Sequence, residues 1–143
     1  MPVTATLQYS PVPSAGSITA DVIDNNGNPS SVIDANLDFT VKGALTVSAG
    51  GMLDGKFKLT LLGDEHGGQF DAAVISADVD ITGDGSFPYV ITIPANTLPR
   101  PAVVGGARPR QVMSLYLLVT YVTAGGADTD LTAIAELGTF LFS

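Results

Sequence analysis

The sequence predicts an all-β protein, a single antiparallel β-sandwich of about eight strands with immunoglobulin-like or jelly-roll connections. Apolar and polar residues alternate with period two in several segments, which is the pattern of strands with one buried face. Clusters of Gly, Pro, Asn and Asp separate these segments. The chain has 143 residues without an internal repeat or linker, so residues 1–143 are expected to form one domain.

The first expected strand covers residues 4–9 and ends at Pro11 and Pro13. Residues 17–23 form the second and run into an Asp/Asn/Gly-rich turn that ends at Pro29. Asn and Gly tolerate positive φ there, and Pro fixes the exit. The third strand covers residues 33–41, nine residues of nearly clean alternation, and residues 44–47 continue it after a kink at Gly43.

Five more segments complete the expected set: residues 55–62, 70–81, 89–93, 113–122 and 133–142. The best helix candidate, residues 130–137, is short and uncapped, so no helix is expected. Residues 113–122 are apolar or aromatic at both phases of the alternation, as are the last residues of the chain. Such strands are typical of sheets that are covered on both faces. The second cover is either another copy or a partner, or the chain's own residues 98–111 or 133–142.

The composition argues against several classes of function. The net charge is −8, which disfavours nucleic acid and anionic membrane as partners. No apolar run is long enough for a transmembrane helix, so membrane insertion is not expected. Without cysteine, thiol catalysis and Cys-based metal sites are excluded. The N-terminal residues lack the pattern of a secretory signal, which favours a cytoplasmic or particle-associated protein over a secreted one.

Two short segments carry a family resemblance. Residues 20–29, ADVIDNNGNP, resemble the strand and Asp-rich turn of bacterial immunoglobulin-like modules. Residues 91–98, ITIPANTL, followed by LYL at 115–117, are similar to a run that is common in such β-sandwiches. The resemblance implies a structural or adhesive role rather than a catalytic one.

A calcium loop is one candidate site. Asp78, Asp80, Thr82 and Asp84 offer oxygen ligands near Gly83, although position twelve of such a loop is Tyr89 rather than Glu. The alternative is a solvated strand end that runs into a turn. A second oxygen-rich turn is formed by Asp24, Asn26 and Asn28. No other cofactor is expected.

No catalytic residues are assigned, and the protein is not expected to be an enzyme. His66 is the only histidine and lies in a Gly-rich turn. A Ser–His–Asp triad would need it, but no Gly-x-Ser-x-Gly motif exists to identify the serine. The acidic residues on the polar phase of strands, such as Asp34 and Asp38, are interpreted as a wet face rather than as a glycosidase pair.

The interface candidates are arginines and exposed apolar residues. Arg100, Arg108 and Arg110 lie in a long connection, residues 98–111, and arginine is favoured at interfaces. Tyr116, Leu118, Phe140 and Phe142 lie on the strands with two apolar faces. Lys56 and Lys58 are interpreted as protection of a sheet edge against aggregation.

Two functions remain open. The first is a non-enzymatic structural or assembly subunit that self-associates or docks on a larger particle, filament or surface. The second is a monomeric binding module for a ligand or carbohydrate, possibly calcium-supported, with Tyr9, Tyr89, Tyr116 and Tyr121 as its platform. The chain has no Trp, which disfavours the carbohydrate site.

Overall fold

The computed structural model describes residues 2–9, 12–48, 50, 53–67, 71–98, 105–106 and 110–142. The described residues form strands and turns and contain no helix, which confirms the all-β prediction. The strands are β1 Val3–Tyr9, β2 Val12–Ile23, β3 Val32–Ile33, β4 Phe39–Val47, β5 Lys56–Glu65, β6 Asp71–Asp80, β7 Gly85–Ile93, β8 Gln111–Val122 and β9 Asp128–Phe142.

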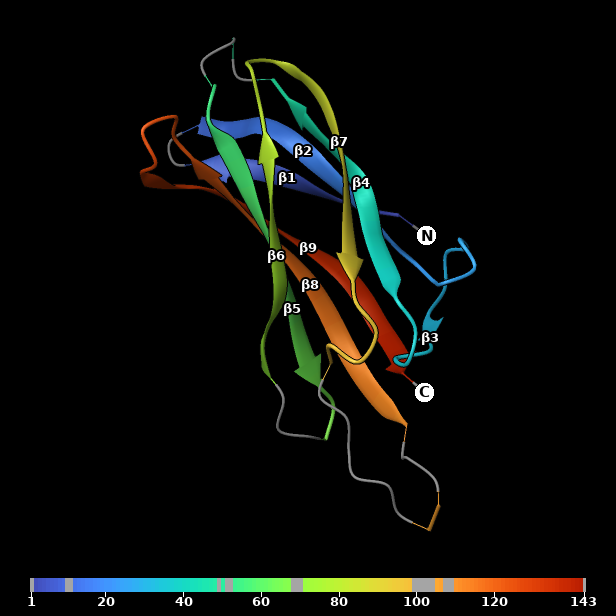
Figure 1. Cartoon of the computed structure of the whole chain (residues 1–143). Coiled ribbons are helices and arrows are strands. Elements are labelled where there is room, and N and C mark those ends of the chain that lie inside the picture. The colour runs from blue at the N-terminus through green and yellow to red at the C-terminus, as the bar shows by residue number, and fades with distance from the viewer. Residues whose placement is uncertain are drawn as a thin grey trace.

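The strands form two sheets (Figure 1). Sheet A has the antiparallel order β1-β2-β4-β7. Sheet B has the antiparallel order β6-β5-β8-β9, and β3 adds to β9 in parallel. One residue pair between β1 and β9, Gln8 with Thr132, joins the sheets at one side. At the other side β6 and β7 follow each other along the chain but are not neighbours in the sheet order.

The expected eight-stranded sandwich is not confirmed. The described residues form nine strands, and sheet B curves into a half-barrel instead of lying as a flat layer. Strong curvature has a local cause in the β-bulges of this sheet, because an extra residue on one strand bends it and increases its twist. Register shifts occur between β5 and β6 and twice between β8 and β9.

The single strand expected for residues 33–41 is wrong. β3 ends at Ile33, and β4 begins only at Phe39. The Asp34 carboxylate accepts a hydrogen bond of 2.9 Å from the Asn36 amide, and the Leu37 amide donates to the Asp34 carbonyl at 3.1 Å. Local side-chain hydrogen bonds of this kind compete with extended structure and close a turn. The continuation through Gly43 is confirmed, because β4 runs without a break to Val47.

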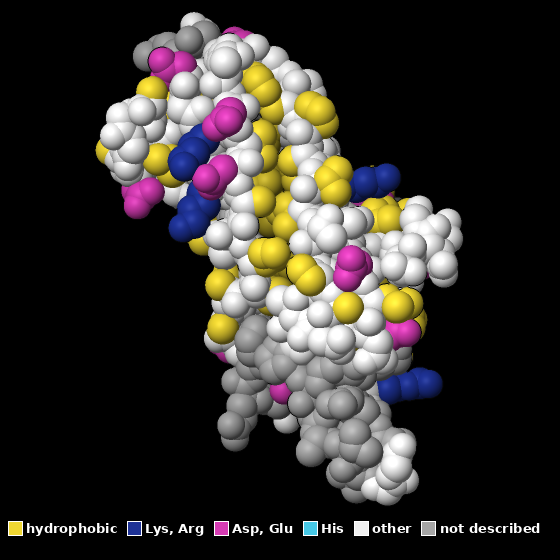
Figure 2. All heavy atoms as spheres, in the orientation of Figure 1, with side chains coloured by type: hydrophobic (Ala, Val, Ile, Leu, Met, Phe, Trp, Pro, Cys, Tyr) yellow, Lys and Arg dark blue, Asp and Glu magenta, His cyan; other side chains and the backbone are white. Residues whose placement is uncertain are grey.

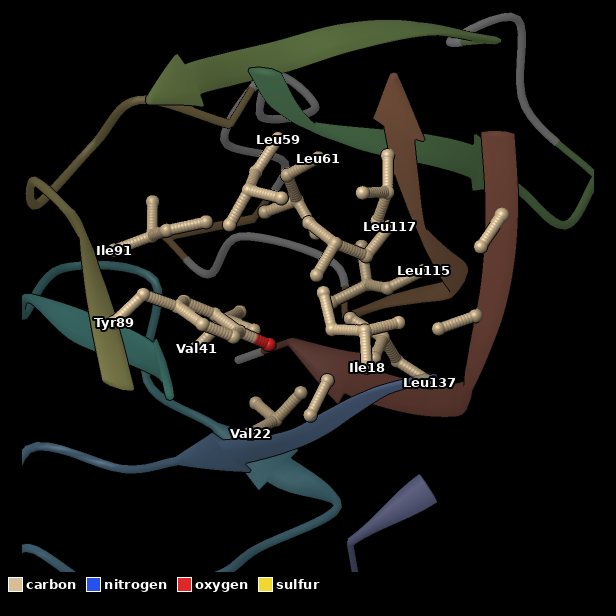
Figure 3. Packing of buried hydrophobic residues seen from close by; sticks show 14 of the residues in the cluster. Ile18, Val22, Val41, Leu59, Leu61, Tyr89, Ile91, Leu115, Leu117 and Leu137 are labelled. Atoms are coloured by element: carbon tan, nitrogen blue, oxygen red, sulfur yellow. The ribbon is translucent and has the colours of Figure 1, made fainter. Parts of the chain in front are cut away.

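The core contains the inner faces of both sheets. Figure 3 shows side chains from both sheets that point toward one another, among them Ile18, Val41 and Tyr89 from sheet A and Leu61 and Leu117 from sheet B. Along β8 the alternate residues Met113, Leu115, Leu117, Val119 and Tyr121 are all buried. The opposite phase of β8 therefore faces outward.

A bulge in β9 explains why the end of the chain is apolar at both phases. Leu115 pairs with Gly138, and the next residue of β8, Tyr116, pairs with Glu136, so Leu137 has no partner of its own. The backbone of Gly138 has a φ of 118°, which residues with a side chain rarely adopt. The extra residue shifts the alternation by one position. Odd residues up to Leu137 face the core, and beyond the bulge even residues do.

Candidate interaction site

Four apolar side chains gather on the outer face of sheet B. Leu118 of β8 lies opposite Ile134 of β9, and its neighbour along the same face, Tyr116, lies opposite Leu62 of β5. Strand spacing brings such directly opposed residues into side-chain contact range. Ile134 is 60% exposed, and the other three are half-buried. We call Leu62, Tyr116, Leu118 and Ile134 the outer patch.

Charged residues border the outer patch at two opposite corners. Glu136 lies on β9 opposite Tyr116, and Lys58 lies on β5 opposite Thr120. Both side chains are exposed. Among the residues that the structure describes, neither forms an ion pair. Within the described part of the chain, the patch is therefore an apolar surface with an unpaired lysine on one side and an unpaired glutamate on the other.

The sequence identified two of the four patch residues. Tyr116 and Leu118 were candidates because β8 is apolar at both phases. Leu62 and Ile134 were missed. A signal for Ile134 was present, since it occupies the polar phase of its strand between Thr132 and Glu136. What the sequence could not supply was the register that places it beside Leu118.

The other interface candidates have different locations. Phe140 and Phe142 are 6% and 1% exposed and belong to the core, because the bulge at Gly138 turns them inward. The Phe142 ring packs against Phe39 with centroids 5.8 Å apart. The expectation that these two residues form an interface is therefore wrong, because both are buried in the core. Arg110 is exposed immediately before β8, whereas Arg100 and Arg108 lie outside the described residues.

The structure brings His66 to a serine that the sequence could not identify. The His66 Nε2 atom lies 2.6 Å from the Ser114 Oγ atom, and the Ser114 hydroxyl is 3.4 Å from that of Thr139. This pair lies on the exposed outer face of sheet B. A triad also needs a group that orients the histidine. Within the described part of the chain, the His66 ring has no second hydrogen-bond partner.

The calcium candidates lie at the end of β6 and in the following turn. Asp78, Asp80, Thr82 and Asp84 are all exposed. The Asp78 carboxylate is bound by the Lys56 amine at 3.0 Å, and this contact raises the pKa of Lys56. Over the described ranges, no three acidic or histidine side chains are grouped so that they could hold a metal ion.

The turn at Asp24 has an alternative to metal binding. The Asp24 Oδ1 atom accepts hydrogen bonds from the amides of Asn26 and Asn28, at 2.9 and 3.0 Å. The carboxylate therefore organises the turn itself, as Asp commonly does in such positions.

The tyrosines expected as a binding platform are dispersed. Tyr89 and Tyr121 are 6% exposed and belong to the core, and Tyr116 lies in the outer patch. The side chain of Tyr9 lies outside the described part of the structure. The Tyr89 hydroxyl donates to the Thr19 carbonyl oxygen at 2.7 Å, and burial raises the pKa of Tyr89.

The interpretation of Lys56 and Lys58 as edge protection is wrong. β5 pairs with β6 on one side and with β8 on the other, so it is an interior strand. The true edges are β6 and β7, with a groove of about 340 Å³ between them. Figure 2 shows the hydrophobic side chains that line this groove, with acidic and basic side chains close beside them. Pro88, which has no backbone N–H, lies on the β7 edge and weakens it as a template for another strand.

The comparisons with known proteins assign no family. No protein-family model matches the chain, and no similar curated protein is found. Within the described residues there is no helix with the length and apolar character that crossing a membrane requires.

Proposed function

We propose that this protein is a non-enzymatic structural subunit that associates with copies of itself through the outer patch. The single observation that supports this proposal is the grouping of Leu62, Tyr116, Leu118 and Ile134 on one solvent-facing sheet surface. Contiguous exposed apolar surface flanked by polar residues is typical of protein–protein contact sites. Aromatic residues are also enriched in such contacts.

Three further features favour a non-enzymatic structural subunit. Charged residues make up only 14% of the chain, which is sparse for a soluble domain. The Ser114–His66 pair lies on an open sheet surface rather than in a cleft, where catalytic groups are usually enclosed. The resemblance of two segments to bacterial immunoglobulin-like modules, which are structural or adhesive, is in line with a subunit of a particle, filament or surface layer.

The test is the mass of the protein in solution, measured by sedimentation velocity over a hundredfold range of concentration. The wild type is expected to form dimers or larger species as the concentration rises. Ile134→Ser and Leu118→Ser are expected to shift the protein toward the monomer, because each removes apolar area from the patch.

Val90→Ser is the matched control. Val90 is 65% exposed, as prominent as Ile134, but lies on β7 in sheet A. Association should therefore be unchanged in this variant. A wild type that stays monomeric over the whole range would contradict the proposal.

A further inference from the structure

Lys58 and Glu136 lie on opposite sides of Leu118, at equal distances from it along the sheet. β8 lies between β5 and β9. Glu136 of β9 is level with Tyr116, and Lys58 of β5 is level with Thr120. Leu118 lies midway between Tyr116 and Thr120, so it also lies midway between the two charges. Standard strand spacings place the Cα atoms of Lys58 and Glu136 each about 8 Å from the Cα atom of Leu118, on opposite sides of it.

We propose that two copies of this chain pack face to face around a two-fold axis over Leu118, with Lys58 of each copy paired to Glu136 of the other. This inference rests on the proposed function, since it assumes self-association through the outer patch. The axis runs parallel to the sheet surface and perpendicular to the line from Lys58 to Glu136. A rotation about it exchanges the two charge positions, and both ion pairs then form together.

The geometry suits these side chains. Sheets that pack face to face lie about 10 Å apart, and the gap widens toward the strands that flank β8 because the outer patch is on the convex side of the half-barrel. Extended Lys and Glu side chains are long enough to meet across this gap from both sides. The axis crosses the strands obliquely, so the strands of the two copies cross steeply, as in orthogonal sheet packing. Leu118 of one copy then meets Leu118 of the other at the centre, with Tyr116 and Ile134 around it.

The electrostatics favour a second copy in this orientation. Each chain carries a net charge of −8, so two copies repel one another at long range and need local attraction to associate. Asp78 is the register partner of Lys58, but its carboxylate is bound by Lys56. No other carboxylate of the described residues is paired with Lys58, so its amine can bind a carboxylate of a second copy. In this orientation the two Glu136 side chains of the dimer lie on opposite sides of the axis and do not face one another.

Charge reversal tests the axis. Lys58→Glu alone and Glu136→Lys alone each place like charges against one another twice, so each is expected to weaken dimerisation by about tenfold or more. An equimolar mixture of the two variants should recover wild-type affinity as a heterodimer, since one copy then supplies two anions and the other two cations. The double variant should recover it as a homodimer.

Two controls match the change in net charge. Lys42→Glu changes the net charge as Lys58→Glu does, and Asp128→Lys changes it as Glu136→Lys does. Both control residues are exposed and lie outside the outer patch, so neither variant should weaken dimerisation. Circular dichroism of every variant verifies that it is folded. Dimerisation of the reversal variants equal to that of these controls would overturn the axis, while the proposed function would stand if Leu118→Ser still dissociated the dimer. A wild type that remains monomeric would overturn both.

Discussion

The Tyr89 hydroxyl of β7 reaches across β4 to donate a hydrogen bond of 2.7 Å to the Thr19 carbonyl oxygen of β2. The two residues are separated by Gly43, which pairs with Tyr89 on one side and with Ala20 on the other. The absence of a side chain at Gly43 leaves room for the phenol inside the core. One side-chain hydrogen bond thus ties together three strands of sheet A.

The first prediction concerns Gly43. A Cβ atom at this position would overlap with the Thr19 carbonyl oxygen and lie 3.0 Å from the Tyr89 hydroxyl. Gly43→Ala is therefore expected to lower the free energy of unfolding by about 2 kcal/mol or more, as overpacked core positions do. Urea denaturation measures this loss. Gly125→Ala is the control, because its Cβ would meet nothing closer than 3.9 Å; an equal loss in both variants would contradict the prediction.

The second prediction concerns pH. Burial raises the pKa of Tyr89 above its ordinary value near 10. The unfolded chain therefore loses the Tyr89 proton at lower pH than the folded chain. The contribution of neutral Tyr89 to the free energy of unfolding is then complete below about pH 10 and is lost as the pH rises further. Tyr89→Phe should lower the stability by about 1–2 kcal/mol at neutral pH, because it leaves the Thr19 carbonyl without its donor.

The measurement for Tyr89 is urea denaturation of both proteins between pH 7 and 11. The wild type should lose stability more steeply than Tyr89→Phe above pH 10. Parallel curves for the two proteins would show that another group causes the alkaline loss.

The third prediction concerns the β9 bulge. The φ of 118° at Gly138 is strained for any residue with a side chain, so Gly138→Ala should cost about 1–2 kcal/mol of stability. Deletion of Gly138 should cost much more, because it removes the bulge and turns Phe140 and Phe142 toward solvent. Thermal unfolding distinguishes the two variants. A deletion that unfolds at the temperature of Gly138→Ala would show that the bulge does not set the phase of this strand.

The fourth prediction separates core residues from surface residues among those that the sequence proposed for the interface. Phe142→Ala should lower the free energy of unfolding by about 3–5 kcal/mol, because it leaves a cavity against Phe39. Ile134→Ala, at a 60% exposed position, should change stability little but weaken association. Chemical denaturation and sedimentation on the same samples give both quantities. Large destabilisation by Ile134→Ala would show that this side chain serves the fold of the single chain.

The sequence predicted most strands well where the alternation was clean. The strand expected at residues 55–62 is present as β5, and its buried residues Phe57, Leu59 and Leu61 alternate with polar ones because successive side chains of a strand point to opposite faces of the sheet. It failed at residues 33–41, where clean alternation continued through a turn. The Asp34 hydrogen bonds that close this turn leave no mark in the periodicity.

Local sequence thus determined the all-β class and most of the turns, since these depend on short-range periodicity and turn chemistry. Tertiary structure decided which strands are neighbours, and with them the outer patch. Leu62, Leu118 and Ile134 are far apart in sequence, and only the pairing of β5, β8 and β9 brings them together. It also decided that Phe140 and Phe142 belong to the core, because one unpaired residue at the β9 bulge reverses every side chain beyond it.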